Sequence, residues 1–112
     1  MATLRAEEAR RIARHVLAHQ AEAVVDDVLM VVSELVSNAV RHAGGVTGFD
    51  IRVEADAVVV EVADASPQQP HSPGSPVHVP GGFGWLLVNR LTQHTEIRSG
   101  PHGKTITAYL AT

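Results

Sequence analysis

The chain has 112 residues, the length of one compact domain with one hydrophobic core, and we expect that domain to span residues 1–112. A formal net charge of -3 argues against a nucleic acid as the main partner, because duplex binding needs a concentrated basic surface. The lack of cysteine excludes disulfide and thiolate chemistry, and no apolar run approaches the roughly 20 residues of a membrane span.

The first 42 residues predict two helices. The N-terminus lacks the apolar core of a signal peptide, so we expect a cytoplasmic protein that does not contact membranes. Helical spacing of Ile12 and Val16 predicts an amphipathic helix over about residues 5–20. A longer helix is predicted from about Glu22 to His42, and Gly44-Gly45 is expected to end it as a glycine cap. Its apolar arc comprises Val28, Val31, Val32, Leu35, Val36 and Ala39.

The next segment has the alternating pattern of β-strands. Residues 49–54 and 58–63 predict two strands of an antiparallel hairpin, joined by a tight turn. Five prolines between Ser66 and Pro80 exclude a helix or an inner strand, so this stretch is an extended loop. A loop of that length in so small a domain is usually functional or disordered.

The last third of the chain predicts one more helix and two strands. The glycine-rich segment 81–84 leads into a short apolar helix over residues 85–91, and strands follow at 95–98 and 105–110. The order helix, helix, strand, strand, loop, helix, strand, strand predicts an α+β two-layer sandwich. We expect a mostly antiparallel sheet of four to five strands, covered on one face by the three helices.

Polar residues stand at the edges of these elements. Glu34, Asn38 and His42 recur every fourth residue, so they follow one stripe of the long helix beside its apolar arc. Asp64 ends the second strand, and Gly82 and Gly84 open a helix, where unpaired N–H groups suit a phosphate chain. Each feature also has a plain structural explanation, since a solvated helix face, a turn-forming aspartate and flexible glycines need no ligand.

Gly103-Lys104-Thr105 has the letters that end a phosphate-binding P-loop. The position five before Gly103 is Arg98 instead of glycine, and a strand follows where the P-loop requires a helix. We therefore reject a Walker A motif at this position.

Four motifs in the same order resemble the GHKL (Bergerat-fold) ATP-binding superfamily, the histidine-kinase-like ATPase domains. They are Glu-x-x-x-Asn-Ala-x-x-His on the long helix, Asp-x-Ser after the strand pair, Gly-x-Gly opening a helix, and Gly-Lys-Thr before the last strand. Within the superfamily, the chain is most similar to bacterial anti-sigma regulatory factors of the serine-protein-kinase type. The resemblance extends from about residue 5 to residue 110.

This resemblance implies an ATP site that also binds Mg²⁺. Asn38 matches the magnesium ligand, and Glu34 matches the carboxylate that serves as general base on a serine hydroxyl or on water. Asp64 matches the aspartate that accepts a hydrogen bond from the adenine amino group, and Thr105 matches the threonine that helps to hold it. His42 matches a position near the phosphates.

The glycines and the proline-rich loop complete the implied site. Gly82 and Gly84 match the glycines that bring backbone close to the phosphates, and residues 66–80 correspond to the lid over the nucleotide. Ser66 replaces the usual glycine and adds a side chain beside the adenine pocket. Because the lid contains no Lys or Arg, Arg41, Arg90 or a partner protein has to supply positive charge for the phosphates.

Two functions follow as expectations from the resemblance. The first is an ATP-dependent regulator that captures a sigma factor and phosphorylates a serine on an anti-sigma antagonist protein, with a second copy of the chain as a further candidate partner. The second is a non-catalytic partner-switching module whose nucleotide binding is weak or lost. A histidine autokinase is disfavoured, because the chain lacks the helical region that would carry a phosphoacceptor histidine.

Overall fold

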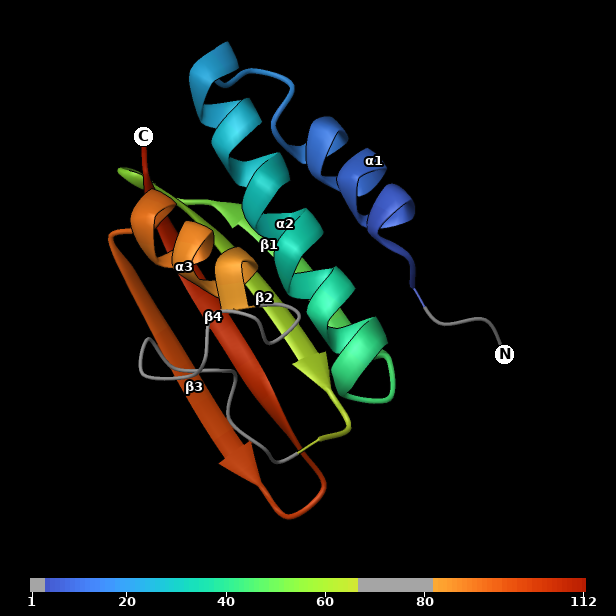
Figure 1. Ribbon diagram of the computed structural model, residues 1–112. Coiled ribbons are helices and arrows are strands. Elements are labelled where there is room, and N and C mark those ends of the chain that lie inside the picture. Colours follow the sequence, from blue (N-terminus) through green and yellow to red (C-terminus); the bar gives the residue numbers. More distant parts are fainter. Residues whose placement is uncertain (1–3, 67–81) are drawn as a thin grey trace.

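The protein is a two-layer α+β structure, as predicted (Figure 1). The computed structural model describes residues 4–66 and 82–112, and every statement below refers to this part of the chain. Within it the sheet has four strands in the order β1-β2-β4-β3, and each neighbouring pair is antiparallel. The elements are α1 (Ala6–Val16), α2 (Glu22–His42), β1 (Val46–Val53), β2 (Ala57–Asp64), α3 (Gly82–Leu91), β3 (His94–Gly100) and β4 (Gly103–Ala111).

The long helix α2 lies at the centre of the helical layer, between α1 and α3 (Figure 1). All six residues of its predicted apolar arc are buried, at most 3% exposed. The helix ends where the two glycines were expected to end it. Gly44 and Gly45 have φ angles of 76° and 106°, and the Gly45 N–H donates to the Ala39 carbonyl at 2.9 Å.

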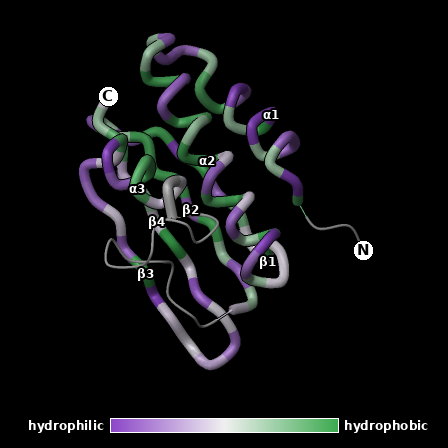
Figure 2. Tube along the Cα trace, in the orientation of Figure 1, coloured by the Kyte–Doolittle hydropathy of each residue, from purple (hydrophilic) through white to green (hydrophobic). Residues whose placement is uncertain are grey.

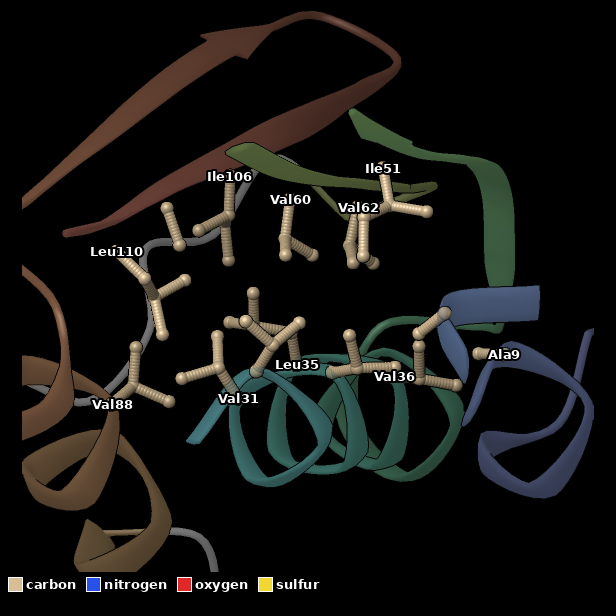
Figure 3. Packing of buried hydrophobic residues seen from close by; sticks show 14 of the residues in the cluster. Ala9, Val31, Leu35, Val36, Ile51, Val60, Val62, Val88, Ile106 and Leu110 are labelled. Carbon is tan, nitrogen blue, oxygen red and sulfur yellow. The ribbon is translucent and has the colours of Figure 1, made fainter. Parts of the chain in front are cut away.

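Strand alternation places one set of side chains of each central strand against the helices. In β2 this set includes Val58, Val60 and Val62, and in β4 it comprises Ile106, Ala108 and Leu110. Figure 3 shows several of them pointing toward Leu35 and Val31 of α2 and toward Val88 of α3. Hydropathy follows this arrangement, since β2 is mostly apolar and the edge strand β3 is mostly polar (Figure 2).

The first helix is shorter than predicted. It ends at Val16 instead of about residue 20, because the chain must turn within five residues so that α2 can pack beside α1. Leu17 follows the last turn and is buried, and the Gln20 N–H donates to its carbonyl at 2.9 Å. No helix in residues 4–66 and 82–112 is long and apolar enough to cross a membrane.

Candidate functional site

The predicted stripe on α2 faces the start of α3. Glu34 and Asn38 are half-buried and His42 is exposed. A Cβ atom added to Gly84 would overlap Oε2 of Glu34, so the Glu34 carboxylate lies directly against the backbone of the first turn of α3. The absence of a side chain at Gly84 leaves room for the carboxylate in this position, at the N-terminal end of a helix.

The other end of the stripe reaches the end of β2. A Cβ atom added to Gly44 would lie 3.8 Å from Cβ of Ala65, which places the chain that follows α2 beside the residue that follows Asp64. The α2 stripe therefore begins beside the first turn of α3, at Glu34, and runs toward the end of β2, which the chain reaches just after α2 ends. Figure 1 shows α2 lying over the sheet, with α3 on one side of it.

Arg41 contacts the amide that was predicted to bind the metal. Its Nη2 donates to Oδ1 of Asn38 at 3.2 Å, on an exposed part of α2. Arg41 also borders a cavity of about 210 Å³ that Arg5 and Ser37 line between α1 and α2. Arg41, one of the two arginines proposed to supply positive charge for the phosphates, thus lies next to Asn38. The other, Arg90, is exposed in the last turn of α3.

Asp64 forms a buried ion pair with Lys104. The Nζ atom of Lys104 lies 3.0 Å from Oδ2 and 3.1 Å from Oδ1 of Asp64, and the two side chains are only 7% and 3% exposed. The backbone N–H of Ser66 donates to Oδ1 at 2.9 Å, and Lys104 also donates to the Ser66 carbonyl at 3.3 Å. The carboxylate that is predicted to bind the adenine base, Asp64, therefore already has an ammonium partner.

The register of the sheet explains this pair. Asp64 and Lys104 are direct cross-strand partners in β2 and β4, so their side chains lie on the same face of the sheet. Both continue the helix-facing sets of their strands, two residues from Val62 and from Ile106 respectively. Gly103 makes the close approach of the strands possible here, because a Cβ atom at that position would overlap the Asp64 carbonyl oxygen.

Thr105 does not share this face. It lies between Lys104 and Ile106 in a continuous register, so strand alternation directs its side chain to the side of the sheet away from Asp64. Lys104 takes the place next to Asp64 that the family resemblance assigns to Thr105. Counting residues back by twos from Ile106 would have identified Lys104 from the sequence as a residue on the apolar face.

The predicted lid lies outside the described residues, except for Ser66 at its first position. Ser66 is half-buried and is held near Asp64 by the two hydrogen bonds above. Gly82 is the first residue of α3. Trp85 is part of the hydrophobic core and is 7% exposed.

The side chains present suit a phosphate-bound Mg²⁺ better than a metal site made of protein alone. Among the described residues, no group of three or more His, Asp or Glu side chains is placed to hold a metal ion. Mg²⁺ is commonly held by one or two protein oxygens together with phosphate oxygens and water. The Asn38 amide oxygen and the nearby Glu34 carboxylate are oxygen donors of that kind, so the residues fit Mg²⁺ with a bound nucleotide.

Comparisons with known proteins identify the fold. Residues 2–110 match the family model of the histidine kinase-like ATPase domain. No curated protein sequence matches the chain.

Solved structures of histidine kinases are similar in fold. The histidine kinase domain of the blue-light activated kinase EL346 from Erythrobacter litoralis has a TM-score of 0.58 and 16% identity, over 98% of this chain and 64% of that one. The catalytic domain of histidine kinase ThkA has a TM-score of 0.57 and 14% identity, over 98% of this chain and 95% of that one. Histidine kinase AdeS from Acinetobacter baumannii has a TM-score of 0.57 and 10% identity, over 98% of this chain and 66% of that one. The chain thus spans about two thirds of the EL346 and AdeS structures.

Proposed function

Because this chain belongs to the histidine kinase-like ATPase domain family, a family of ATP-binding domains, we propose that it is an ATP-dependent protein serine kinase of the anti-sigma type. It captures a sigma factor and transfers the terminal phosphoryl group of Mg-ATP to a serine of an antagonist protein. The subtype rests on the motif resemblance, and the family membership rests on the match over residues 2–110.

One observation carries the catalytic part of this proposal. The Glu34 carboxylate lies against the backbone of Gly84 in the first turn of α3, where helix geometry favours bound phosphate. A general base has to lie within hydrogen-bond reach of the group that it deprotonates, and near the phosphate that this group attacks. Glu34 is the acidic residue of the α2 stripe, and its place beside the first turn of α3 supports its assignment as the general base.

Each residue of the proposed site has its own role in the reaction. Bound Mg-ATP would supply the terminal phosphoryl group: its phosphorus forms a bond to the serine oxygen, the bond to the β–γ bridging oxygen breaks, and ADP leaves. Glu34 accepts the proton of that serine hydroxyl, and the Asn38 amide oxygen would hold the Mg²⁺ that accompanies the nucleotide. Arg41, which already contacts Asn38 at 3.2 Å, adds positive charge beside the phosphates. Gly82 and Gly84 bring backbone N–H groups close to the phosphates, and His42 lies at the exposed end of the stripe.

The base of the nucleotide is recognised at the end of β2. Asp64 accepts a hydrogen bond from the adenine amino group, and Ser66 borders the base through its position beside Asp64. Positioning and charge neutralisation supply most of the rate enhancement in phosphoryl transfer, so a site of this kind needs few reactive groups.

A non-catalytic partner-switching module is the second candidate function. The observation that favours it is that both principal polar residues already have partners, Asp64 with Lys104 at 3.0 Å and Asn38 with Arg41 at 3.2 Å. In such a module the polar groups satisfy one another, and regulation depends on protein binding alone.

The experiment uses the tagged chain to recover its partner from the parent bacterium. The complex receives Mg-ATP, and mass spectrometry maps new phosphorylated residues in each recovered protein. A kinase phosphorylates serine on a partner, and Glu34→Ala removes the phosphorylation while the partner stays bound.

The two candidate functions predict different outcomes of this experiment. The module predicts partner recovery without phosphorylation in both the wild type and Glu34→Ala. Phosphorylation that survives Glu34→Ala would refute the role of Glu34 as the base. An Arg52→Met variant, altered on an exposed part of β1, serves as the matched control and keeps both binding and phosphorylation.

A further inference from the structure

The carboxylate proposed to recognise the base is one half of a donor–acceptor pair. Lys104 Nζ lies 3.0 Å and 3.1 Å from the two oxygens of Asp64, and both side chains are more than nine-tenths buried. An ammonium group is a donor only, and a carboxylate is an acceptor only. The end of β2 and the start of β4 therefore present one donor and one acceptor side by side.

The edge of a purine base near position 6 carries the same two kinds of group. Adenine has a 6-amino donor beside the N1 acceptor, whereas a 6-oxo purine has an O6 acceptor beside an N1–H donor. A lone carboxylate matches the amino group of adenine and repels the O6 atom of a 6-oxo purine. A carboxylate–ammonium pair matches both edges, because the two groups exchange roles between the two bases.

Both members of the pair have capacity for a further hydrogen bond. A carboxylate offers about four acceptor positions, and among the described residues Oδ2 of Asp64 accepts only from Lys104. The longest contact of Lys104 is the 3.3 Å hydrogen bond to the Ser66 carbonyl. That contact is the one most readily redirected to a base, since the bonds to Asp64 need not break.

We propose that Lys104 is a specificity-determining residue of the base site, which lets the chain bind 6-oxo purine nucleotides about as well as adenine nucleotides. This inference rests on the proposed nucleotide site. Lys104 shares the Asp64 carboxylate with the bound base and donates either to N1 of adenine or to O6 of a 6-oxo purine.

The test compares the binding of ATP and inosine triphosphate (ITP), which differ only at the position-6 edge. Calorimetry with Mg²⁺ gives the dissociation constants for the wild type, for Lys104→Met and for Arg52→Met. Lys104→Met removes the ammonium group and keeps an unbranched side chain. Arg52→Met removes a cation from an exposed ion pair of β1, outside the site, and is the matched control.

The ratio of the two dissociation constants decides the inference. We expect the wild type and Arg52→Met to prefer ATP over ITP by less than about fivefold, and Lys104→Met to prefer ATP by roughly 5- to 150-fold, the usual value of one good base contact. A strong preference for ATP in the wild type would overturn the inference, as would an equally low ratio in Lys104→Met.

Two further outcomes are also decisive. If Lys104→Met does not fold, the wild-type ratio alone decides, because a lone-carboxylate site requires strong rejection of ITP. If neither nucleotide binds the wild type, the proposed nucleotide site fails and this inference fails with it, whereas ATP binding with strong rejection of ITP removes only the role of Lys104.

Discussion

Removal of Lys104 tests whether the buried ion pair is a structural element of the fold. In Lys104→Met the Asp64 carboxylate, 3% exposed, keeps the hydrogen bond from the Ser66 N–H at 2.9 Å but loses its ion pair with the Lys104 ammonium group. Burying a charge without a counter-ion is costly, because the charge has lost its hydration and gained nothing in exchange. The variant is therefore expected to be much less stable than the wild type.

The magnitude follows from the burial of the pair. Removing one partner of a buried ion pair typically costs about 3–5 kcal/mol. A domain of this size has a total unfolding free energy of about 5–15 kcal/mol, so the loss is a large fraction of it. With an m-value of about 1.5 kcal/mol/M, the urea midpoint falls by roughly 2–3 M.

The assay is urea unfolding of four proteins: the wild type, Lys104→Met, Asp64→Asn and the double variant. The double variant removes both charges and retains a side-chain oxygen that accepts from the Ser66 N–H. We expect it to be no less stable than either single variant, because replacing a whole buried pair is often neutral. Arg52→Met, in the exposed ion pairs of β1, is the control and leaves the midpoint unchanged.

Two results would refute this reasoning. An unchanged midpoint in Lys104→Met would mean that Asp64 does not depend on the ammonium group. Additive losses in the double variant would mean that the two side chains stabilise the fold independently.

Three further substitutions test the neighbouring contacts. Gly84→Ala displaces the Glu34 carboxylate, which costs about 0.5–1.5 kcal/mol, and gains up to about 1 kcal/mol of helix propensity. Because these two effects nearly cancel, the urea midpoint should change little, whereas phosphorylation of the partner should fall about 100-fold. Gly103→Ala brings a Cβ atom onto the backbone of β2 and should lower the unfolding free energy by about 1–3 kcal/mol, so an unchanged midpoint would contradict the observed strand approach. Arg41→Met removes the donor to Asn38 and should weaken Mg-ATP about tenfold in calorimetry; tighter binding would instead identify Arg41 as a competitor for the amide.

The long helix α2 was the element whose bounds local sequence patterns predicted best. The bounds of α2 follow from an uninterrupted helical period that two glycines end, and both signals lie within a few residues of the positions that they determine. The end of α1 at Val16 depends instead on the turn that packs α1 beside α2, which is a tertiary requirement. The pairing of β2 with β4 also joins distant parts of the chain, and strand patterns alone do not specify it.

In the candidate site too, local helix geometry could be predicted from the sequence, whereas features that depend on tertiary structure could not. The spacing of Glu34 and Asn38 placed them on one stripe, because helix geometry alone relates them. The sequence motif predicts that Thr105 lies beside Asp64. The register of β4 instead places Lys104 on the same face of the sheet as Asp64. The contact of Arg41 with Asn38 is allowed by their spacing of three residues, but the conformation of a long side chain depends on its surroundings.

Calorimetric titration of the purified chain with Mg-ATP tests the central claim, a nucleotide site between the α2 stripe and the end of β2, most directly. We predict one saturable site with a micromolar dissociation constant, weakened at least about tenfold by Asn38→Ala and by Asp64→Asn in variants that remain folded. The absence of binding heat at millimolar Mg-ATP, or binding that both substitutions leave unchanged, would contradict it.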